Sequence, residues 1–499
     1  METLSRRLLD SRERELHDSL LREPVTVLQV GEGNFLRGFT DWMLHECRKQ
    51  GLFNGGVAVT QPRPAGREKI EALAAQDGLY TLVTRGLERG EPVERREIVS
   101  VFTEAFDAYS EWERFVELAE RPELRFVVSN TTEAGLAYVP EKVAEGEPIA
   151  SFPGKAAYLL YRRFLRFGGE PGRGLIWLPC ELLERNGDEL KRCIMRHSRD
   201  WGLPEAFEKW VETENRFLNS LVDRIVTGYP EGLAEEWFGE WGYLDRLLNT
   251  AEPYHFWAIE AESELERELP LKQAGLNVVW TDDLKPYQLR KVRILNGAHT
   301  LMAPIGILHG FEHVGELMAD TDFGAFVAGA VEQEIIPTLP LGREALQAYA
   351  ADVFDRFRNP YLRHRLADIA MNGLSKFKVR LLTSIAHYAE QGLPVPERLV
   401  RGVAGMLRYY RTERSADGSF EGVTLTGRTY AVRDDGAAVD ALAQAWRTAT
   451  REACSGSETA GRLLALTGVW GRDLTAWPGF AEAVGSVLAE WETREAAGR

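Results

Sequence analysis

The sequence predicts an α/β fold in two parts: an N-terminal Rossmann-like dinucleotide-binding domain and an all-α C-terminal domain. Strand and helix signals alternate through the first half, as in a mostly parallel sheet covered by helices. A glycine-rich turn directly follows the first strand signal, and long helical patterns replace strand signals after about Leu284. We therefore expect a Rossmann-like domain over residues 1–284 and a helical substrate or catalytic domain over residues 285–499.

The first expected unit is a strand, a turn and a helix. Residues 25–30 are apolar, rich in β-branched side chains and bounded by a proline and a glycine, which indicates a buried strand. Residues 35–50 form an amphipathic pattern that Gly51 closes, which favours a helix. Residues 56–60 indicate a second buried strand.

The remaining elements follow the same signals. In the first half, strands are expected at residues 80–84, 95–102, 125–129 and 174–178, and helices at 111–119 and 155–167. In the second half, helices are expected at residues 287–308, 321–335, 343–357, 375–390, 396–410, 436–453 and 477–496. Because proline cannot donate a backbone hydrogen bond, we expect the helix from residue 287 to kink or end at Pro304.

Composition argues against several classes of function. A formal net charge of −16 argues against nucleic acid or an anionic membrane as a partner. No run approaches the ~18 apolar residues of a membrane span, and the charged N-terminus lacks the apolar core of a signal peptide. The four cysteines show no CxxC spacing, and no HxH or HExxH motif is present, so we expect reduced thiols and no metal. These features predict a cytoplasmic enzyme.

The glycine-rich turn comprises Gly31, Glu32, Gly33, Asn34, Phe35, Leu36, Arg37 and Gly38. In a dinucleotide fingerprint, the first glycine allows the tight turn, the second lets backbone approach the pyrophosphate, and helix N–H groups face the phosphates. Arg37 is also placed to reach a phosphate. The match is imperfect, because the third glycine of G-x-G-x-x-G would fall at Leu36. An ordinary strand–helix turn is the alternative, and the flanking elements favour the cofactor site.

The end of the second strand bears on the identity of the cofactor. An NAD site usually places Asp or Glu there to bind the ribose 2′-hydroxyl. Here the strand runs into Gln61, Pro62, Arg63 and Pro64, with Arg67 close behind. Taken alone, this basic pattern favours the 2′-phosphate of NADP, so NAD and NADP both stay open.

Lys291, Asn296 and His299 lie close together in an expected helix. At 100° per residue, Asn296 lies about 140° and His299 about 80° round from Lys291, so all three can line one broad face. A lysine that can lose its proton, beside neutral hydrogen-bonding groups, suits alcohol–ketone interconversion. Only 11 of the 60 basic residues are lysines, so a lysine here suggests a role that arginine cannot perform. The alternative is a solvated lysine, a helical asparagine and a core histidine.

Several motifs carry a family resemblance. They are VLQVGEGNFLRGF (27–39), VVSNTTEAGL (127–136), SFPGKAAYLL (151–160), LPCELLERNGDEL (178–190), NSLVDRIV (219–226), YHFWAIE (254–260), KVRILNGAHT (291–300) and NPYLRHRLADIAMNGLSKFKVRLL (359–382). Through their order and spacing, the chain resembles the mannitol dehydrogenase family of long-chain polyol dehydrogenases from about residue 24 to 480. GEGNFLRGF, SNTTEAG and SKFKVR point to its tagaturonate reductase branch.

This resemblance implies reversible NAD-dependent hydride transfer between tagaturonate and altronate, with Lys291 as the acid–base group. It also implies that Asn296 is an oxyanion-hole donor and that His299 binds the substrate. Asn130 and Thr131, in SNTTEAG, are implied contacts of the cofactor.

Two further residues are matched to the family. Asp223 corresponds to an acidic residue near the catalytic lysine. Asn186 corresponds to a second oxyanion-hole amide, although family members often show Cys-Asp-Asn where this chain has Cys180, Glu181 and Leu182. For both residues the alternative is structural: a turn at Asn186, and a capping or ion-pair feature at Asp223.

The carboxylate of a sugar acid must be met by cations or hydrogen-bond donors. Lys376, Lys378 and Arg380 form a basic triplet, and their spacing places Lys376 and Arg380 on one helical face. The resemblance also marks Lys376 as a substrate-side lysine, and His255 is a further candidate. The alternative is that the triplet complements a helix end or an acidic surface.

The sequence leaves several alternative functions open. A relative that acts on fructuronate and mannonate would differ mainly in stereochemistry, and one that acts on mannitol would prefer neutral polyols. From another class, the chain could be a non-catalytic dinucleotide-binding sensor. A sensor has no need of a proton acceptor, so the joint presence of Lys291, Asn296 and His299 weighs against it. The oligomeric state stays undetermined.

Overall fold

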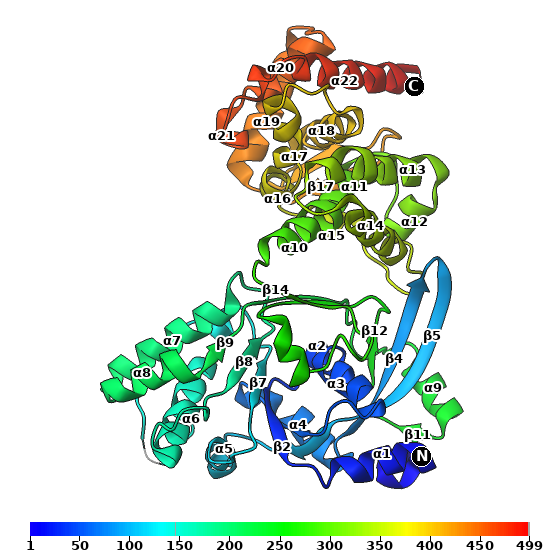
Figure 1. Cartoon of the computed structure of the whole chain (residues 1–499). Coiled ribbons are helices and arrows are strands. Elements are labelled where there is room, and N and C mark those ends of the chain that lie inside the picture. The colour runs from blue at the N-terminus through cyan, green and yellow to red at the C-terminus, as the bar shows by residue number, and fades with distance from the viewer. Residues whose placement is uncertain (145, 498–499) are drawn as a thin grey trace. The chain divides into compact units, whose positions relative to one another are not determined.

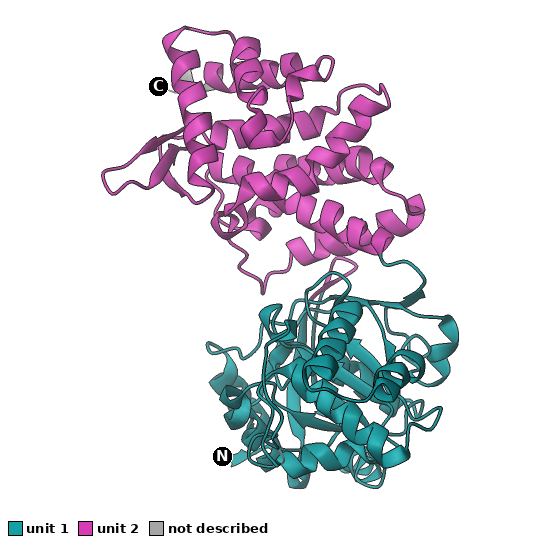
Figure 2. Cartoon of the chain, turned by 90° about the vertical axis from the view of Figure 1, so that its left-hand side faces the viewer, with its two compact units in different colours: residues 1–85, 92–284 teal, residues 86–91, 285–499 magenta. Residues whose placement is uncertain are grey.

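The computed structural model describes residues 1–144 and 146–497 (Figure 1). The chain divides into two compact units (Figure 2). Unit 1 comprises residues 1–85 and 92–284, and unit 2 comprises residues 86–91 and 285–499. Each unit has its own core and is described by itself.

The centre of unit 1 is a six-stranded parallel sheet in the order β6-β3-β2-β7-β8-β9. Its strands are β2 (Val25–Val30), β3 (Gly56–Thr60), β6 (Phe102–Ala105), β7 (Phe126–Ser129), β8 (Ile176–Pro179) and β9 (Arg216–Phe217). After β2 the chain adds β3 and β6 on one side, then β7, β8 and β9 on the other. This reversal puts a topological switch point between β2 and β7, which confirms the predicted Rossmann-like fold.

Helices cover both faces of this sheet. The helices of unit 1 are α1 (Ser11–Leu20), α2 (Asn34–Arg37), α3 (Thr40–Lys49), α4 (Arg67–Ala75), α5 (Trp112–Ala119), α6 (Phe152–Phe167), α7 (Asn186–Asp200), α8 (Glu205–Glu214) and α9 (Ala234–Trp241). Apolar residues of α3 and α4 share one buried cluster with Val27, whereas those of α5 to α8 share another with Leu28 and Val30. Successive residues of a strand point to opposite faces, and four of the six residues of β2 are valine or leucine because both faces are covered.

Two strands expected in the parallel sheet lie elsewhere. β4 (Leu79–Glu88) and β5 (Glu91–Ser100) form a separate three-stranded sheet with β12 (Asn249–Ala251). Between them, Arg89 and Gly90 have φ of 52° and 80°, the left-handed conformations of a tight hairpin turn. A two-residue connection cannot provide the long crossover that parallel pairing requires. The prediction that residues 80–84 and 95–102 join the main sheet was therefore wrong.

Unit 1 also contains two smaller sheets. They are formed by β10 (Ser220–Asp223), β13 (Phe256–Glu260) and β14 (Val278–Thr281), and by β1 (Glu2–Thr3) and β11 (Tyr243–Leu244).

Unit 2 is largely helical. Its α-helices are α10 (Lys285–Arg290), α11 (Asn296–Leu308), α12 (Val314–Ala319), α13 (Thr321–Gly329), α14 (Arg343–Phe357), α15 (Leu366–Ala370), α16 (Gly373–Arg380), α17 (Leu382–Glu390), α18 (Glu397–Tyr409), α19 (Gly436–Arg451), α20 (Gly456–Leu464), α21 (Thr467–Trp470) and α22 (Phe480–Ala497). The apolar helix α11 is central, because α15, α16 and α18 all pack against it (Figure 1). A helix that is apolar all round belongs in a core.

Three details of unit 2 differ from the expectation. The unit is not wholly helical, because β15 (Thr412–Arg414), β16 (Phe420–Val423) and β17 (Thr429–Val432) form an antiparallel sheet. These strands are too short for a periodic signal. The helix from residue 287 does not end at Pro304, because α11 runs through it to Leu308. Instead, two π-helical turns interrupt the helices, η5 (Lys291–Leu295) and η6 (Ala330–Ile335).

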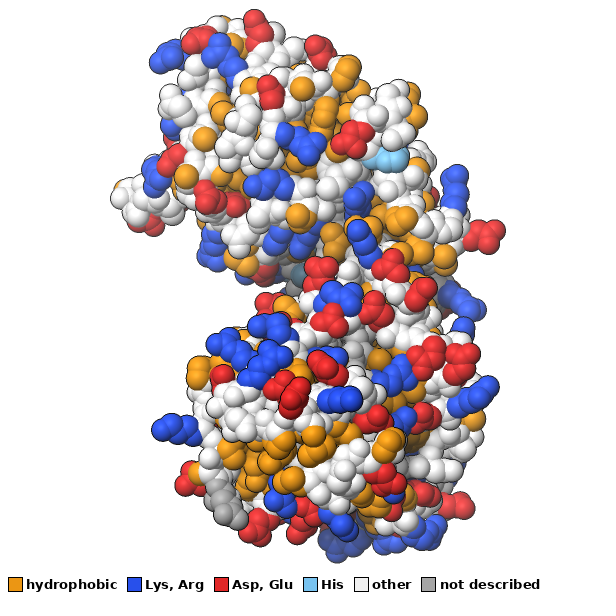
Figure 3. All heavy atoms as spheres, turned by 60° about the vertical axis from the view of Figure 1, so that its left-hand side comes forward, with side chains coloured by type: hydrophobic (Ala, Val, Ile, Leu, Met, Phe, Trp, Pro, Cys, Tyr) orange, Lys and Arg blue, Asp and Glu red, His pale blue; other side chains and the backbone are white. Residues whose placement is uncertain are grey.

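None of the described helices is both long and apolar enough to cross a membrane. On the face shown in Figure 3, basic and acidic side chains are interspersed, so the net charge is not gathered there into one acidic patch.

A buried polar relay supports the turn after β2. The Nε2 atom of Gln29 donates to the Gly31 carbonyl at 2.9 Å and to Asp41 Oδ2 at 3.1 Å. Both side chains are buried, and burial of Asp41 raises the pKa of its carboxyl to about 8. Near neutral pH, Asp41 therefore favours its protonated form in the folded protein.

We predict a pH dependence of stability from Asp41. Between its ordinary pKa near 4 and its folded pKa of about 8, the folded protein holds one proton more than the unfolded chain. This contribution is fully present below pH ~4 and is lost as the pH rises through ~8, with a slope approaching about 1.4 kcal/mol per pH unit.

The Asp41→Asn variant should lose this contribution, because the amide does not titrate. Its free energy of unfolding in urea should fall less between pH 5 and pH 8 than that of the wild type. Equal falls in the two proteins would contradict the prediction.

Candidate functional site

The turn after β2 lies at the switch point and fits a dinucleotide. Gly31 has φ of 138°, and a Cβ there would lie 3.0 Å from the Asn130 carbonyl oxygen at the end of β7. Gly31 therefore permits both the turn and the close approach of the two strand ends. A Cβ at Gly33 would meet no atom within 4 Å. The space beside Gly33 is open, as the approach of a pyrophosphate to backbone requires.

The other residues of the turn build its support. Leu36 is buried, and Phe35 stacks on Phe39 with ring centroids 4.9 Å apart. A Cβ at Gly38 would lie 2.8 Å from Val226 Cγ1, so Gly38 allows the turn to pack closely against the segment that follows β10.

Arg37 is buried beneath the turn. Its guanidinium donates to Asn34 Oδ1 at 2.7 Å, to the Glu32 carbonyl at 3.3 Å and to the Leu247 carbonyl. These bonds hold the turn from within the protein. Arg37 thus braces the loop, a role that the sequence did not indicate, rather than presenting its charge at the surface.

The predicted cofactor contacts Asn130 and Thr131 follow β7 and are held by the end of β8. Asn130 Nδ2 donates to the Cys180 carbonyl at 2.8 Å. The backbone N–H and the hydroxyl of Thr131 both donate to the buried Glu181 carboxylate, at 2.9 and 3.1 Å. Burial raises the pKa of Glu181, and the donors from Thr131 and Ser129 oppose that rise. Glu181 therefore positions this loop, which sequence reasoning missed.

Asn186 cannot serve as an oxyanion-hole donor in this arrangement. Its fully buried Nδ2 lies 3.0 Å from the Pro179 carbonyl oxygen and 3.1 Å from those of both Glu181 and Ser220. Its Oδ1 accepts the N–H groups of Gly187 and Ser220. An amide has two N–H hydrogens, and both are used here. Asn186 instead joins β8, α7 and β10, which corrects the expected role.

His255 also has a structural role. Its Nδ1 lies 3.2 Å from the Pro253 carbonyl oxygen, and its Nε2 accepts the backbone N–H of Asn277 at 3.0 Å. Burial, together with Arg224, lowers the pKa of the imidazole to about 4, so it is neutral near pH 7. A neutral ring with both nitrogens engaged does not meet a carboxylate, and the expected substrate contact is corrected.

Asp223 is buried at the end of β10, where it pairs with Phe256 of β13. It belongs to unit 1, with the dinucleotide turn, whereas Lys291 belongs to unit 2. The predicted place of Asp223 near Lys291 therefore stays a prediction.

In unit 2, Lys291 begins the π-helical turn η5. The backbone N–H of Asn296 donates to the Lys291 carbonyl, five residues back. Residues five apart in such a turn are about one helical turn apart. Asn296 therefore stands above Lys291 on the same side of the helix, instead of the 140° away that an α-helix would give. The π-turn aligns the two residues more closely than the sequence spacing indicated.

His299 lies one further turn along, in α11. Its ring packs against Phe357 and His364, with centroids 4.5 and 4.9 Å apart, and its buried Nε2 has no hydrogen-bond partner among the described residues. Burial, together with the cations around it, lowers the pKa of the imidazole well below its usual value. His299 is therefore a neutral group, and its buried Nε2 is a polar atom without a hydrogen bond among the described residues.

The cations that act on His299 are His364, when protonated, and Arg356, Arg380 and Lys376. Arg380 donates to Thr300 Oγ1 at 3.2 Å, and Lys376 donates to the Ile369 carbonyl at 2.9 Å. Burial lowers the pKa of both, and neither forms an ion pair with a described carboxylate. Partly buried cations of this kind favour an anionic ligand.

Of the basic triplet, Lys376 and Arg380 are among the groups that lower the pKa of His299. Lys378 is two residues from each and is not among the groups that act on the pKa of His299. At 100° per residue it points away from the face that the other two share. His364 and Arg356 were not predicted from the sequence as site residues. His364 lies in the family motif of residues 359–382, whereas Arg356 lies outside every motif.

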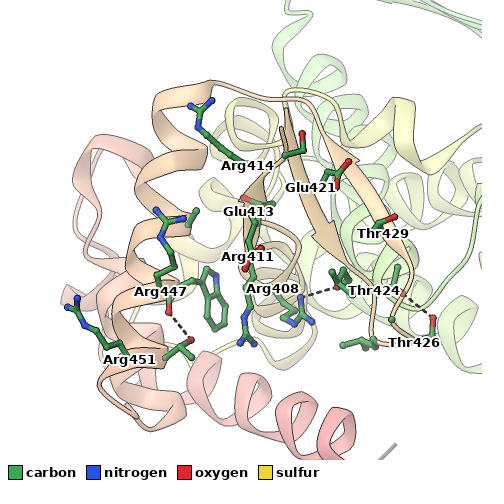
Figure 4. Close-up of a pocket in the computed structure, with 18 residues that line it drawn as sticks. Arg408, Arg411, Glu413, Arg414, Glu421, Thr424, Thr426, Thr429, Arg447 and Arg451 are labelled. Atoms are coloured by element: carbon green, nitrogen blue, oxygen red, sulfur yellow. Dashed lines mark hydrogen bonds between the residues drawn. The ribbon is translucent and has the colours of Figure 1, made fainter. Parts of the chain in front are cut away.

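A cavity of about 930 Å³ opens elsewhere in unit 2, beside β15, β16 and β17 (Figure 4). Five arginines line it. Three of them face acids: Arg414 lies 2.6 Å from Asp440, Arg411 lies 3.6 Å from Glu492, and Arg451 lies 3.7 Å from Glu452. It contains none of the predicted site residues, and its positive charge is largely matched. No three His, Cys, Asp or Glu side chains in the described part of the chain are grouped to hold a metal.

Comparison with known families accounts for most of the chain. The Rossmann domain of mannitol dehydrogenases matches residues 25–273, and the C-terminal domain of mannitol dehydrogenases matches residues 283–491. Among curated proteins, the altronate oxidoreductase of Escherichia coli O7:K1 (strain IAI39) is 40% identical over 466 residues, which are 93% of this chain and 94% of that protein. The altronate oxidoreductase of E. coli O17:K52:H18 (strain UMN026) is 40% identical over 95% of this chain and 96% of its own.

Solved structures share the fold. A substrate-free D-sorbitol dehydrogenase superposes with a TM-score of 0.75 at 20% identity, covering 96% of both chains. Pseudomonas fluorescens mannitol 2-dehydrogenase, in a ternary complex with NAD and D-mannitol, superposes with a TM-score of 0.60 at 21% identity, covering 96% of this chain and 95% of that one.

The two glycines of the turn predict different outcomes of substitution. Gly31→Ala should lower the free energy of unfolding by about 1–3 kcal/mol, because alanine is strained at that φ. Gly33 has φ of −68° and open space beside it, so Gly33→Ala should change stability by less than about 0.5 kcal/mol but weaken NADH binding. Denaturant unfolding and NADH fluorescence titration measure the two effects. A large loss of stability in Gly33→Ala, with NADH binding intact, would contradict the cofactor role of the turn.

Proposed function

The chain belongs to the mannitol dehydrogenase family, and from this premise we propose that it is an altronate oxidoreductase. It would catalyse the reversible reduction of tagaturonate to altronate with NADH. The observation that carries the substrate assignment is the group of partly buried cations that act on the neutral His299 in unit 2. One of them, Arg380, donates to Thr300 of α11, the helix that begins at Asn296. The 40% identity to altronate oxidoreductases supports the same conclusion.

We infer that the open turn at Gly31 and Gly33 and the loop at Asn130 and Thr131 hold the dinucleotide. When bound, NADH supplies the hydride and NAD accepts it in the reverse direction. The chain's own residues do the acid–base work. In reduction, the ammonium of Lys291 gives a proton to the substrate oxygen; in oxidation, neutral Lys291 takes the hydroxyl proton.

Asn296 supplies a hydrogen bond to the same oxygen as negative charge develops on it. A preorganised amide donor stabilises such charge because it need not reorient during the reaction. Since Asn186 is fully engaged within unit 1, Asn296 carries this role in the proposal. In the proposal, the Nε2 atom of His299 binds a neighbouring hydroxyl of the sugar and so orients the chain of the substrate.

The carboxylate of the uronate is assigned to Arg380 and Lys376. Both lie on α16, which packs against α11, and Arg380 donates to Thr300, about one turn beyond Asn296 in α11. Two cations with reduced hydration gain most when an anion binds beside them. A neutral polyol would leave this charge unmet.

The test is the rate of NADH oxidation with tagaturonate, fructuronate and fructose in parallel, followed at the absorbance band of reduced nicotinamide. We expect tagaturonate to be the best substrate. In Lys291→Met, kcat should fall by about 10²- to 10⁴-fold, because the acid–base group is lost, while NADH binding stays unchanged. Lys285→Met, at an exposed lysine of α10, is the matched control and should keep wild-type kcat.

Other outcomes redirect the assignment. Faster turnover of fructuronate would keep the chemistry and change the substrate, and a preference for fructose would overturn the carboxylate site. NADH binding without turnover of any of the three would favour the sensor.

A second prediction tests the cations directly. Arg380→Met and Lys376→Met should each raise the KM for tagaturonate by about tenfold or more, since a charge-assisted hydrogen bond is lost. The KM for NADH should not change. Lys378→Met removes the same charge from the other side of α16 and should leave both values unchanged. Equal effects from Lys378→Met and Lys376→Met would mean that only the general positive charge of the helix matters.

A further inference from the structure

The end of β3 does not offer the group that usually recognises the ribose of NAD. Gln61 occupies this place, and it is fully buried. Its amide donates to Asp107, whose carboxylate also accepts the backbone N–H of Tyr109 at 2.9 Å. Gln61 is therefore committed to the protein, and the exposed Arg63 follows it.

A carboxylate reaches the same place from the glycine-rich turn. Glu32 extends from the turn to Gly66, in the short helix that follows β3 (Pro64–Gly66). A Cβ at Gly66 would lie 2.5 Å from Glu32 Oε1 and 2.8 Å from its Cδ. The absence of a side chain at Gly66 thus makes room for this carboxylate beside the carboxyl end of β3.

The surroundings of Glu32 are polar and positively charged. The side chain is partly exposed, and burial raises the pKa of its carboxyl while Lys69, Arg37 and Arg63 oppose that rise. Arg63 and Lys69 are exposed at the surface. A dinucleotide whose pyrophosphate lies at the turn extends its adenosine over the end of the second strand, which is where Glu32 and these two cations meet.

We propose that the Glu32 carboxylate accepts a hydrogen bond from the 2′-hydroxyl of the adenosine ribose and repels a 2′-phosphate, so that the chain selects NADH over NADPH. The acid comes from the turn after β2 instead of from the end of β3. This inference rests on the proposed dinucleotide site and deepens it. It also explains why a basic strand end, which alone favours NADP, can belong to an NAD enzyme.

The test is equilibrium binding of NADH and of NADPH, measured by nucleotide fluorescence without a sugar substrate. The wild type should bind NADH more tightly. Glu32→Gln keeps the size of the side chain, so the fold is retained. It should weaken NADH binding and strengthen NADPH binding, each by about tenfold, because the charged acceptor and the repulsion are both lost. Glu68→Gln removes the same charge from an exposed position of α4 and should change neither constant.

A double variant locates the phosphate contact. Adding Arg63→Ser to Glu32→Gln should remove the gain in NADPH binding, since Arg63 would then no longer meet the 2′-phosphate. If the wild type binds NADH tightly and Glu32→Gln leaves the ratio of the two constants unchanged, the inference is overturned while the proposed function stands. Binding of neither nucleotide would overturn both.

Discussion

The π-helical turn at Lys291 is the constraint on which the proposed substrate-binding residues of unit 2 depend. A single hydrogen bond, from the N–H of Asn296 to the Lys291 carbonyl, sets the lysine and the amide one above the other. Such turns have poorer backbone geometry than an α-helix and persist where the surrounding packing requires them. That packing is present, because α11 continues from the turn as the central buried helix of unit 2, with α15, α16 and α18 against it. The fold thus holds Lys291 and Asn296, the proposed reacting groups, beside a buried helix.

Electrostatics complements this geometry. The chain is acidic overall, yet Arg356, Lys376 and Arg380 surround an imidazole that burial and these cations keep neutral. Placing positive charge in a partly dry site costs free energy that an anionic ligand offsets. In unit 1, the important charges are two carboxylates. Glu181 holds the loop after β7, and Glu32 lies beside the end of β3. The proposed ligand of each unit therefore rests on specific local charges and not on the net charge.

Much of the fold could be predicted from the sequence, and the wrong predictions show what hydrophobic periodicity does not report. The mostly apolar β2, the glycine turn and the switch to helices predicted the fold, because burial on two faces leaves a direct mark on composition. Periodicity reports burial and not the partner, so the hairpin of β4 and β5 was placed in the wrong sheet. A π-helical turn requires no distinctive type of residue, so it could not be predicted from the sequence. The angle between Lys291 and Asn296 around the helix was therefore predicted from α-helical geometry and was too large. Asn186 and His255 look like ligands in the sequence, and only their saturated hydrogen bonds in the fold show that they are structural.

The most direct test of this account is a crystal structure of the protein with NAD and altronate. We expect the reacting hydroxyl oxygen to lie within hydrogen-bond distance of both Lys291 Nζ and Asn296 Nδ2, with the substrate carboxylate against Arg380 or Lys376. A substrate whose reacting oxygen contacts neither Lys291 nor Asn296, or whose carboxylate lies away from α16, would contradict the account.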